Sequence, residues 1–134
     1  MSRTTLQGVG LADGVAQGKA LICHEAVSVA RIDVLTGILH EPGHPLDGVP
    51  VKGKVLVFPQ GKGSSSGSYI LMNLAEQGTS PEAIVIGKPD TILVAGAILA
   101  KIPLIGEIKQ EDILSIPDGS MLHINGTTGV ITRL

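Results

Sequence analysis

The stretch from residue 54 to residue 106 constrains the fold most, because short apolar runs alternate in it with segments of helical spacing. "KVLVF" begins at residue 54, "AIVIG" spans residues 83–87 and "IPLIG" ends at residue 106. Continuous apolar runs are typical of strands buried on both faces, as in a parallel sheet. The order strand, helix, strand, helix, strand therefore predicts two successive right-handed βαβ crossovers.

The two helices of this unit have recognisable limits. The first is predicted over residues 66–77, where Gly78 is placed to end it and one stripe is apolar: Ile70, Leu71, Leu74 and Ala75. The second is predicted over residues 90–101, with Asp90 as the residue whose side chain caps its first turn.

The flanking segments indicate strands and turns. "LQGVG" and "GKALICH" surround an Asp13-Gly14 turn signal and predict one hairpin, and "SMLHING" with "GVITRL" predicts another around Asn125-Gly126. Five Pro and Gly residues exclude a helix between residues 40 and 53, which we expect to be an ordered surface loop. Hairpins on both sides of a βαβαβ unit predict a three-layer β/β/α fold in a single domain over residues 1–134.

The composition excludes several classes of function. The chain has 10 basic and 12 acidic residues, one Phe and one Tyr, which argues against binding to nucleic acid. No apolar run reaches the length of a membrane span and no signal-peptide core follows the start, so we expect no membrane association and a cytoplasmic location. Cys23 is the only cysteine, so this chain alone lacks the cysteine set of an iron–sulfur or structural zinc site.

The motif "GKGSSSGS", residues 61–68, lies between the first buried strand and the first helix. Backbone N–H groups at a helix start bind anions, and ligands of α/β sheets usually lie beyond the carboxyl ends of the strands. Gly61, Gly63 and Gly67 would let a carboxylate or phosphate approach the backbone closely. The alternative is a plain Gly/Ser connector with a capping serine, but a cap needs only one serine, and Lys62 adds a positive charge.

Two better-known motifs nearly match this loop. In a Walker loop Ser or Thr follows the lysine, whereas Gly63 follows Lys62 here. "GSSSG" satisfies the Gly-x-Ser-x-Gly pattern of hydrolases, and Asp90 or Asp118 followed by His123 completes a triad in the hydrolase order. Against this reading, residues 59–62 separate "KVLVF" from the motif, whereas a nucleophile elbow has almost no spacer.

Other polar side chains suggest a metal site: His24, His40, Glu41, His44 and Asp47. His40 and His44 are four residues apart, a spacing that brings two imidazoles together only on a helix, and Pro42 with Gly43 exclude one. We therefore expect solvated loop histidines. Cys23, in an apolar segment, is expected to be a small core residue rather than a reactive thiol.

The segment from residue 53 to residue 105 resembles the small, swivel-domain subunit of the aconitase X family. The resemblance rests on the Gly-Lys/Arg-Gly-Ser-x-x-Gly-Ser signature after a buried strand, together with "GAILAKIPLI", and continues upstream through "TGILHEPGHPLDGVPVKG". Family members dehydrate either mevalonate 5-phosphate, in archaeal two-subunit enzymes, or cis-3-hydroxyproline, in bacterial ones. "GSY" and "AILAKIPL" are closer to the archaeal type.

The resemblance implies a hydro-lyase whose parts are divided between chains. A cysteine-bearing large subunit would hold the iron–sulfur cluster as Lewis acid, in a heterodimer or higher assembly. This chain would supply Ser64 as the base that takes a proton from the hydroxy-acid substrate, in a positive environment of loop N–H groups, a helix N-terminus and Lys62. Ser65, Ser66 and Ser68 would bind substrate or cap the helix, and hydrogen-bond geometry alone leaves open which hydroxyl of residues 64–66 is the base. The alternative function is that of a non-catalytic module, in which the same loop binds an anion and no reaction takes place.

Overall fold

The centre of the molecule is a parallel sheet formed by β4 (Lys54–Gln60), β5 (Ala83–Lys88) and β6 (Leu104–Gly106). The computed structural model describes residues 4–62 and 67–134. Residues 55–58 of β4 and 83–86 of β5 are fully buried, because other layers cover both faces of these strands. The predicted parallel strands are thus confirmed.

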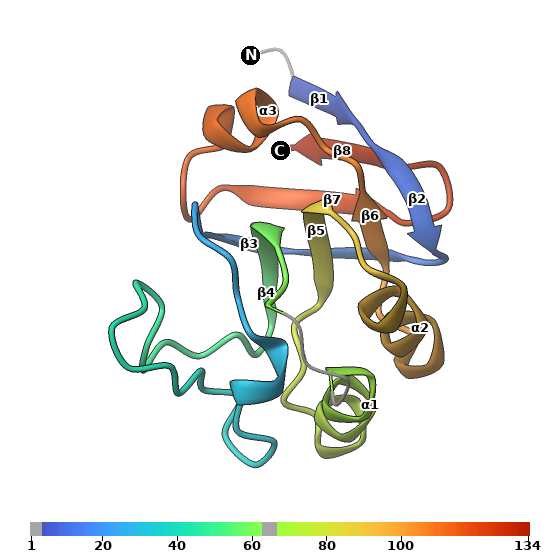
Figure 1. Ribbon diagram of the computed structural model, residues 1–134. Helices are drawn as coiled ribbons and strands as arrows, with labels where there is room; N and C mark the ends of the chain where they lie inside the picture. Colours follow the sequence, from blue (N-terminus) through green and yellow to red (C-terminus); the bar gives the residue numbers. More distant parts are fainter. Residues whose placement is uncertain (1–3, 63–66) are drawn as a thin grey trace.

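Helices α1 (Gly67–Gln77) and α2 (Thr91–Ala100) cover one face of this sheet (Figure 1). Leu71 and Leu74 of α1 and Leu93 of α2 belong to one buried cluster with Leu56, Phe58, Ile84 and Ile86 of the strands. Gly78 follows α1 with φ of +72°, and the Asp90 carboxylate caps α2 by accepting the Leu93 N–H at 2.8 Å. Both predicted helices and both of their end signals are confirmed.

The opposite face is covered by antiparallel strands and a short helix. These are β7 (Met121–Asn125), β8 (Val130–Arg133), β1 (Thr4–Gln7) and α3 (Gln110–Ser115). A second buried cluster joins this layer to the parallel strands through Val55, Val57, Val85, Leu122, Ile124, Ile131 and their neighbours. Alternate residues of β4 therefore face two different cores, which is the predicted three-layer β/β/α arrangement.

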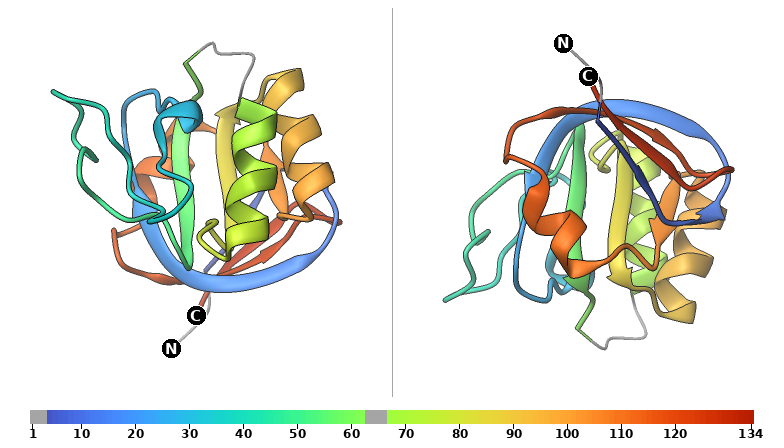
Figure 2. Two further views of the ribbon diagram at one scale, coloured as in Figure 1. Left: turned by 90° about the horizontal axis from the view of Figure 1, so that it is seen from below. Right: turned by 90° about the horizontal axis from the view of Figure 1, so that it is seen from above.

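β3 (Val15–Ile22) connects the two sheet layers. Its first half pairs antiparallel with β7, and its second half pairs parallel with β4. Figure 2 shows it as a long arc that curves from one layer into the other. The full strand order is β1-β8-β7-β3-β4-β5-β6-β2, in which β2 (Val9–Ala12) pairs antiparallel with β6.

The predicted hairpin around Asp13-Gly14 is wrong. β2 and β3 are not paired with each other, because β3 is occupied by β7 and β4 on its two sides. The turn does form, with φ of +123° at Gly14, but it packs against the β7–β8 connection: Gly14 accepts the Gly126 N–H at 2.8 Å. The predicted hairpin around Asn125-Gly126 is confirmed, and the Asn125 side chain accepts the N–H groups of Thr127 and Thr128.

The segment from residue 40 to residue 53 is an ordered loop, as predicted. It is anchored by buried Leu46 and Val51 and by backbone bonds such as Gly48 N–H to Leu39 O at 2.7 Å. A 3₁₀ turn, η1 (Val29–Arg31), packs beside it and was not predicted, nor was α3. The predicted strand segment "LQGVG" is divided at Gly8 between the end of β1 and the start of β2. In residues 4–62 and 67–134, every helix is too short to cross a membrane.

Candidate functional site

The start of the serine motif is fixed to the sheet by backbone bonds. The chain after β3 runs alongside the end of β4, where Cys23 N–H donates to Val57 O at 2.8 Å and Val27 N–H donates to Gln60 O at 3.1 Å. Lys62 N–H then donates to Val27 O at 3.1 Å. Gly61 and Lys62 therefore continue the pairing of the sheet beyond β4.

The amino-terminal ends of α1 and α2 lie at the same edge of the sheet as the end of β4, as two views in Figure 2 show. Each helix follows a parallel strand, so its free N–H groups face the carboxyl edge. A Cβ at Gly61 would lie 3.2 Å from Oδ2 of Asp90, the residue that caps α2. A side chain at position 61 would therefore crowd the residue that caps α2.

The structure describes four of the eight predicted site residues, and it brings them to this edge: Gly61, Lys62, Gly67 and Ser68. Gly67 is the first residue of α1, and half-buried Ser68 lies in its first turn. The predicted base and its neighbours lie outside the described residues: Gly63, Ser64, Ser65 and Ser66.

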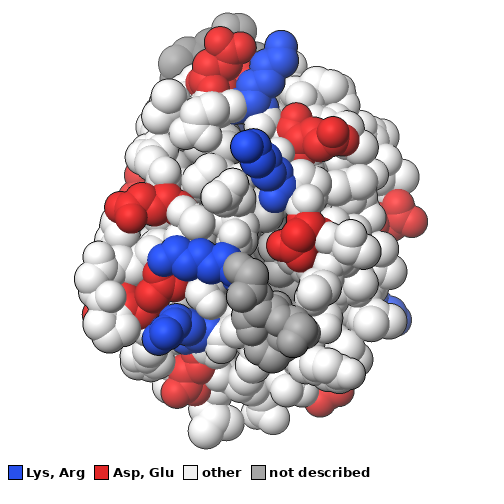
Figure 3. Space-filling view, viewed as in Figure 1, with Lys and Arg blue, Asp and Glu red and all other residues white. Residues whose placement is uncertain are grey.

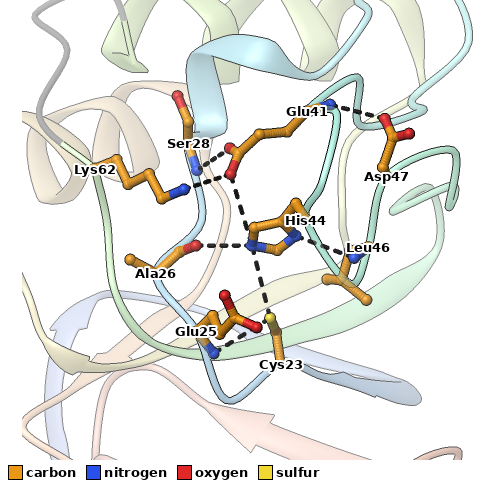
Figure 4. Close-up of polar contacts among 9 residues, drawn as sticks. All are labelled: Cys23, Glu25, Ala26, Ser28, Glu41, His44, Leu46, Asp47 and Lys62. Carbon is orange, nitrogen blue, oxygen red and sulfur yellow. Dashed lines mark hydrogen bonds and ion pairs between the residues drawn. The ribbon is translucent and has the colours of Figure 1, made fainter.

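Sequence reasoning missed the partner of Lys62, which is Glu41 from the loop of residues 40–53. Lys62 Nζ donates to Glu41 Oε2 at 2.5 Å, and the Glu41 side chain is only 9% exposed. The other carboxylate oxygen accepts Ser28 N–H at 3.3 Å, while Glu41 N–H donates to Asp47 Oδ1 at 2.9 Å (Figure 4). The sequence offered only a glutamate in a Pro/Gly-rich loop, with no sign of what it would contact.

The electrostatic environment keeps the Glu41 carboxylate ionised. Burial acts to raise the pKa of Glu41, but the interactions with Lys62, with His44 and with the Ser28 N–H together lower it by more, so the pKa lies below its ordinary value. Elsewhere on this side of the molecule, acidic and basic side chains are interspersed (Figure 3). The site therefore contains the ion pair between Lys62 and Glu41, and the surface around it carries both acidic and basic side chains.

His44 lies beneath this ion pair and is buried, which corrects the prediction of solvated loop histidines; His24 and His40 are exposed as predicted. His44 Nδ1 accepts Leu46 N–H at 3.0 Å, which assigns the proton to Nε2, and Nε2 donates to Ala26 O at 2.8 Å. Both ring nitrogens are thus used to hold the loop. Within the described ranges, no three His, Cys, Asp or Glu side chains are grouped to hold a metal ion.

Cys23, His44 and Glu41 lie in a row, which superficially resembles a catalytic triad. However, Cys23 Sγ and Glu41 Oε2 both approach the same nitrogen, His44 Nε2, at 3.9 Å, and that nitrogen already donates to Ala26 O. A triad needs the nucleophile and the acid on different ring nitrogens. Burial also raises the pKa of the Cys23 thiol, which is 2% exposed, so the prediction of a core cysteine is confirmed.

The structure does not bring together the Asp and His residues that the hydrolase alternative requires. β4 runs two residues beyond "KVLVF", so the spacer before the motif is shorter than the sequence indicated. However, Asp90 caps α2, and Asp118 accepts Ile22 N–H at 2.8 Å. His123 lies in β7, and no hydrogen bond joins it to either aspartate in the part of the chain that the structure describes.

Comparison with known proteins gives curated relatives over almost the whole chain. Phosphomevalonate dehydratase small subunits from Methanosarcina acetivorans and Methanocella arvoryzae are each 39% identical over 127 residues, which is 94% of this chain and 88% and 96% of theirs. The corresponding protein of Pyrococcus furiosus is 37% identical over 127 residues, 94% of this chain and 92% of its own.

Solved structures agree with the fold described above. The crystal structure of Thermococcus kodakaraensis aconitase X in its holo-form matches with a TM-score of 0.92, at 30% identity and 98% coverage of both chains. A UPF0107 protein solved by NMR matches with a TM-score of 0.90 and 35% identity, covering 98% of this chain and 99% of that one. The family model for the aconitase X swivel domain matches residues 5–133, and the chain belongs to this family.

Proposed function

We propose that this chain is the small subunit of an iron–sulfur hydro-lyase that dehydrates mevalonate 5-phosphate to an anhydromevalonate phosphate in the mevalonate pathway to isoprenoids. The observation that carries the proposal is the similarity to curated phosphomevalonate dehydratase small subunits over 94% of the chain. The enzyme is active only when a large subunit is bound, and it acts in the cytoplasm.

The described geometry supports an anion site at the carboxyl edge of the sheet. α1 directs its first N–H groups to this edge, and the half-exposed Lys62 ammonium group lies beside it. Mevalonate 5-phosphate carries a carboxylate and a phosphate, and either group suits such N–H donors. Gly61, Gly63 and Gly67 allow the approach, and Lys62, Ser65, Ser66 and Ser68 bind the substrate.

The reaction removes water across two neighbouring carbon atoms. Ser64, as its alkoxide, takes the proton from the carbon next to the carboxylate, the electron pair of that C–H bond forms the double bond, and the neighbouring hydroxyl leaves as hydroxide. The proton held by Ser64 then passes to this hydroxide, which forms water and restores the alkoxide. Developing negative charge on the carboxylate is stabilised by preorganised N–H donors. The assignment of Ser64 rests on its place in the Gly-Lys-Gly-Ser signature.

The proposed cofactor and partner follow from the cysteine ligands that this chain lacks. Iron–sulfur clusters are held by several cysteine thiolates, whereas Cys23 is the one cysteine of the chain and packs beside His44. The residues of this chain therefore do not fit a cluster. We assign the cluster to a cysteine-bearing large subunit, consistent with the words "small subunit" in the names of the relatives.

The test is reconstitution of this chain with a candidate large subunit. The complex should dehydrate mevalonate 5-phosphate and not cis-3-hydroxyproline, and either isolated subunit should be inactive. Ser64→Ala should abolish turnover without loss of complex formation. The control Ser115→Ala, at an exposed serine on α3, should keep normal turnover. Near-normal turnover by Ser64→Ala would remove Ser64 from the mechanism, and a wild-type complex inactive on mevalonate 5-phosphate would refute the substrate.

A further inference from the structure

The ion pair between Lys62 and Glu41 has one buried and one exposed end. The Glu41 side chain is 9% exposed and that of Lys62 is 51% exposed. An ammonium group has three N–H donors, so one bond to Glu41 is compatible with further bonds to an anion outside. Lys62 is therefore oriented from beneath while its charged end stays accessible.

Glu41 is held in place independently of Lys62. Its Oε1 accepts Ser28 N–H, its own N–H donates to Asp47 Oδ1, and the His44 ring is fixed between Leu46 N–H and Ala26 O directly below it (Figure 4). A buried carboxylate is costly unless it is paired and hydrogen-bonded. The fold thus presents a rigid acceptor that requires a cation at Oε2.

Lys62 is consequently fixed at both ends of its side chain. Its backbone N–H bonds to Val27 O at 3.1 Å, and its Nζ bonds to Glu41. A lysine side chain is otherwise among the most flexible, and ordering it before a ligand arrives reduces the entropy that binding must lose. Anchoring by Glu41 is therefore a form of preorganisation.

We propose that Glu41 is a positioning residue of the dehydratase, which holds the Lys62 ammonium group where it meets an anionic oxygen of the substrate. The inference rests on the proposed function for its catalytic consequence. Glu41 acts only through Lys62, since its own carboxylate is covered by Ser28, Lys62 and the His44 ring.

A double-mutant cycle in the reconstituted complex tests this dependence. Gln has the shape of Glu, but its NH₂ group must face either Ser28 N–H or Lys62 Nζ, so Glu41→Gln loses one acceptor. Glu41→Gln and Lys62→Met should each lower kcat/KM by about tenfold or more, chiefly through a higher KM. The double variant should equal Lys62→Met, and Lys52→Met, at the opposite end of β4, should have no effect; losses that multiply would overturn the proposal.

The same complexes identify the anionic group that Lys62 meets. Inorganic phosphate and acetate are tested as competitive inhibitors of the wild type, of Lys62→Met and of Glu41→Gln. Both variants should weaken inhibition by the same anion, phosphate if Lys62 meets the phosphate group and acetate if it meets the carboxylate. If both variants leave both inhibition constants unchanged, Lys62 does not meet a substrate anion and the proposal is wrong.

A readout independent of turnover separates this inference from the proposed function. Acetylation of the full chain should modify Lys62 several-fold faster in Glu41→Gln than in the wild type, with no change at Lys52. In the wild type, ¹⁵N relaxation should show a more restricted ammonium group at Lys62 than at Lys52. This measurement tests the anchoring of Lys62 even if the Glu41→Gln variant does not fold. Equal mobility of the two lysines would contradict the anchoring, whereas an inactive wild-type complex with restricted Lys62 would refute only the substrate.

Discussion

Gly96 of α2 lies against the backbone of Ser68 in α1, so closely that a Cβ at position 96 would lie 2.6 Å from Ser68 Cα. This contact holds the first turn of α1, which follows directly on the serine motif. The absence of a side chain at position 96 thus allows the first turn of α1 to pack closely against α2.

The variant Gly96→Ala should destabilise the protein despite the better helix propensity of alanine. Overpacking costs about 1–3 kcal/mol, and a contact this short with a backbone atom falls in the upper part of that range, about 2–3 kcal/mol. Alanine regains about 1 kcal/mol of helix propensity, so we expect a net loss of about 1–2 kcal/mol in the free energy of unfolding. Denaturant titration measures it. Ala95→Ser, on the exposed side of the same helix, is the control; a Gly96→Ala protein as stable as that control would show that the helices separate freely.

Acid should destabilise the wild type through Glu41. The pKa of Glu41 is lowered in the folded protein, so its stabilising contribution is present above the ordinary value of 4.5 and is lost as the pH falls below it. Glu41→Gln should therefore be less stable than the wild type at neutral pH, and the difference should shrink in acid. Unfolding free energies over this range test it, with exposed Glu82→Gln as the control; a difference that does not vary with pH would contradict the charge-based cause.

Cys23 should be inert to alkylation in the folded protein. It is 2% exposed, and its burial raises the pKa of the thiol above 9.0, so little thiolate is present or accessible at mildly alkaline pH. Iodoacetamide should label it rapidly only in denaturant, as mass spectrometry can follow. Fast labelling of the native chain would mean that the segment around Cys23 opens readily.

Asp90 should stabilise α2 through its cap rather than through its charge alone. Asp90→Ala removes the acceptor for Leu93 N–H and should cost about 1 kcal/mol in unfolding free energy. Asp90→Asn keeps a side-chain oxygen that can accept the same hydrogen bond, so it should lower the free energy of unfolding by only about 0.3 kcal/mol or less. If the two variants are equally destabilised, the lost negative charge is responsible and not the capping bond.

The central βαβαβ unit could be predicted because its signals are local. The apolar runs at residues 55–58 and 83–86 are buried on both faces, and Asp90 and Gly78 mark helix limits within their own turns. The Asp13-Gly14 hairpin could not be judged in this way, because β2 finds its partner in β6, at Gly106 and Ile105. Helix α3 was missed because one buried residue, Ile113, gives no periodic pattern in six residues.

The position of Gly61 and Lys62 in the fold was predictable from the sequence, but the ion-pair partner of Lys62 was not. A motif that follows a buried parallel strand must lie at the carboxyl edge, where Gly61 and Lys62 are found. The pairing of Lys62 with Glu41, 21 residues away, depends on a loop whose path is set by tertiary contacts such as Leu46 and Val51. The same contacts bury His44, which the sequence alone indicated to be solvated.

Gly8 joins β1 to β2, and these two strands stand at opposite ends of the strand order. One residue thus ties the two ends of the sheet together, and each end strand is only four residues long. Short end strands offer little template for another chain to extend the sheet, which protects against edge-to-edge aggregation. We consequently expect association of this chain with a partner to depend on side chains, and to respond to surface substitutions more than to changes in backbone pairing.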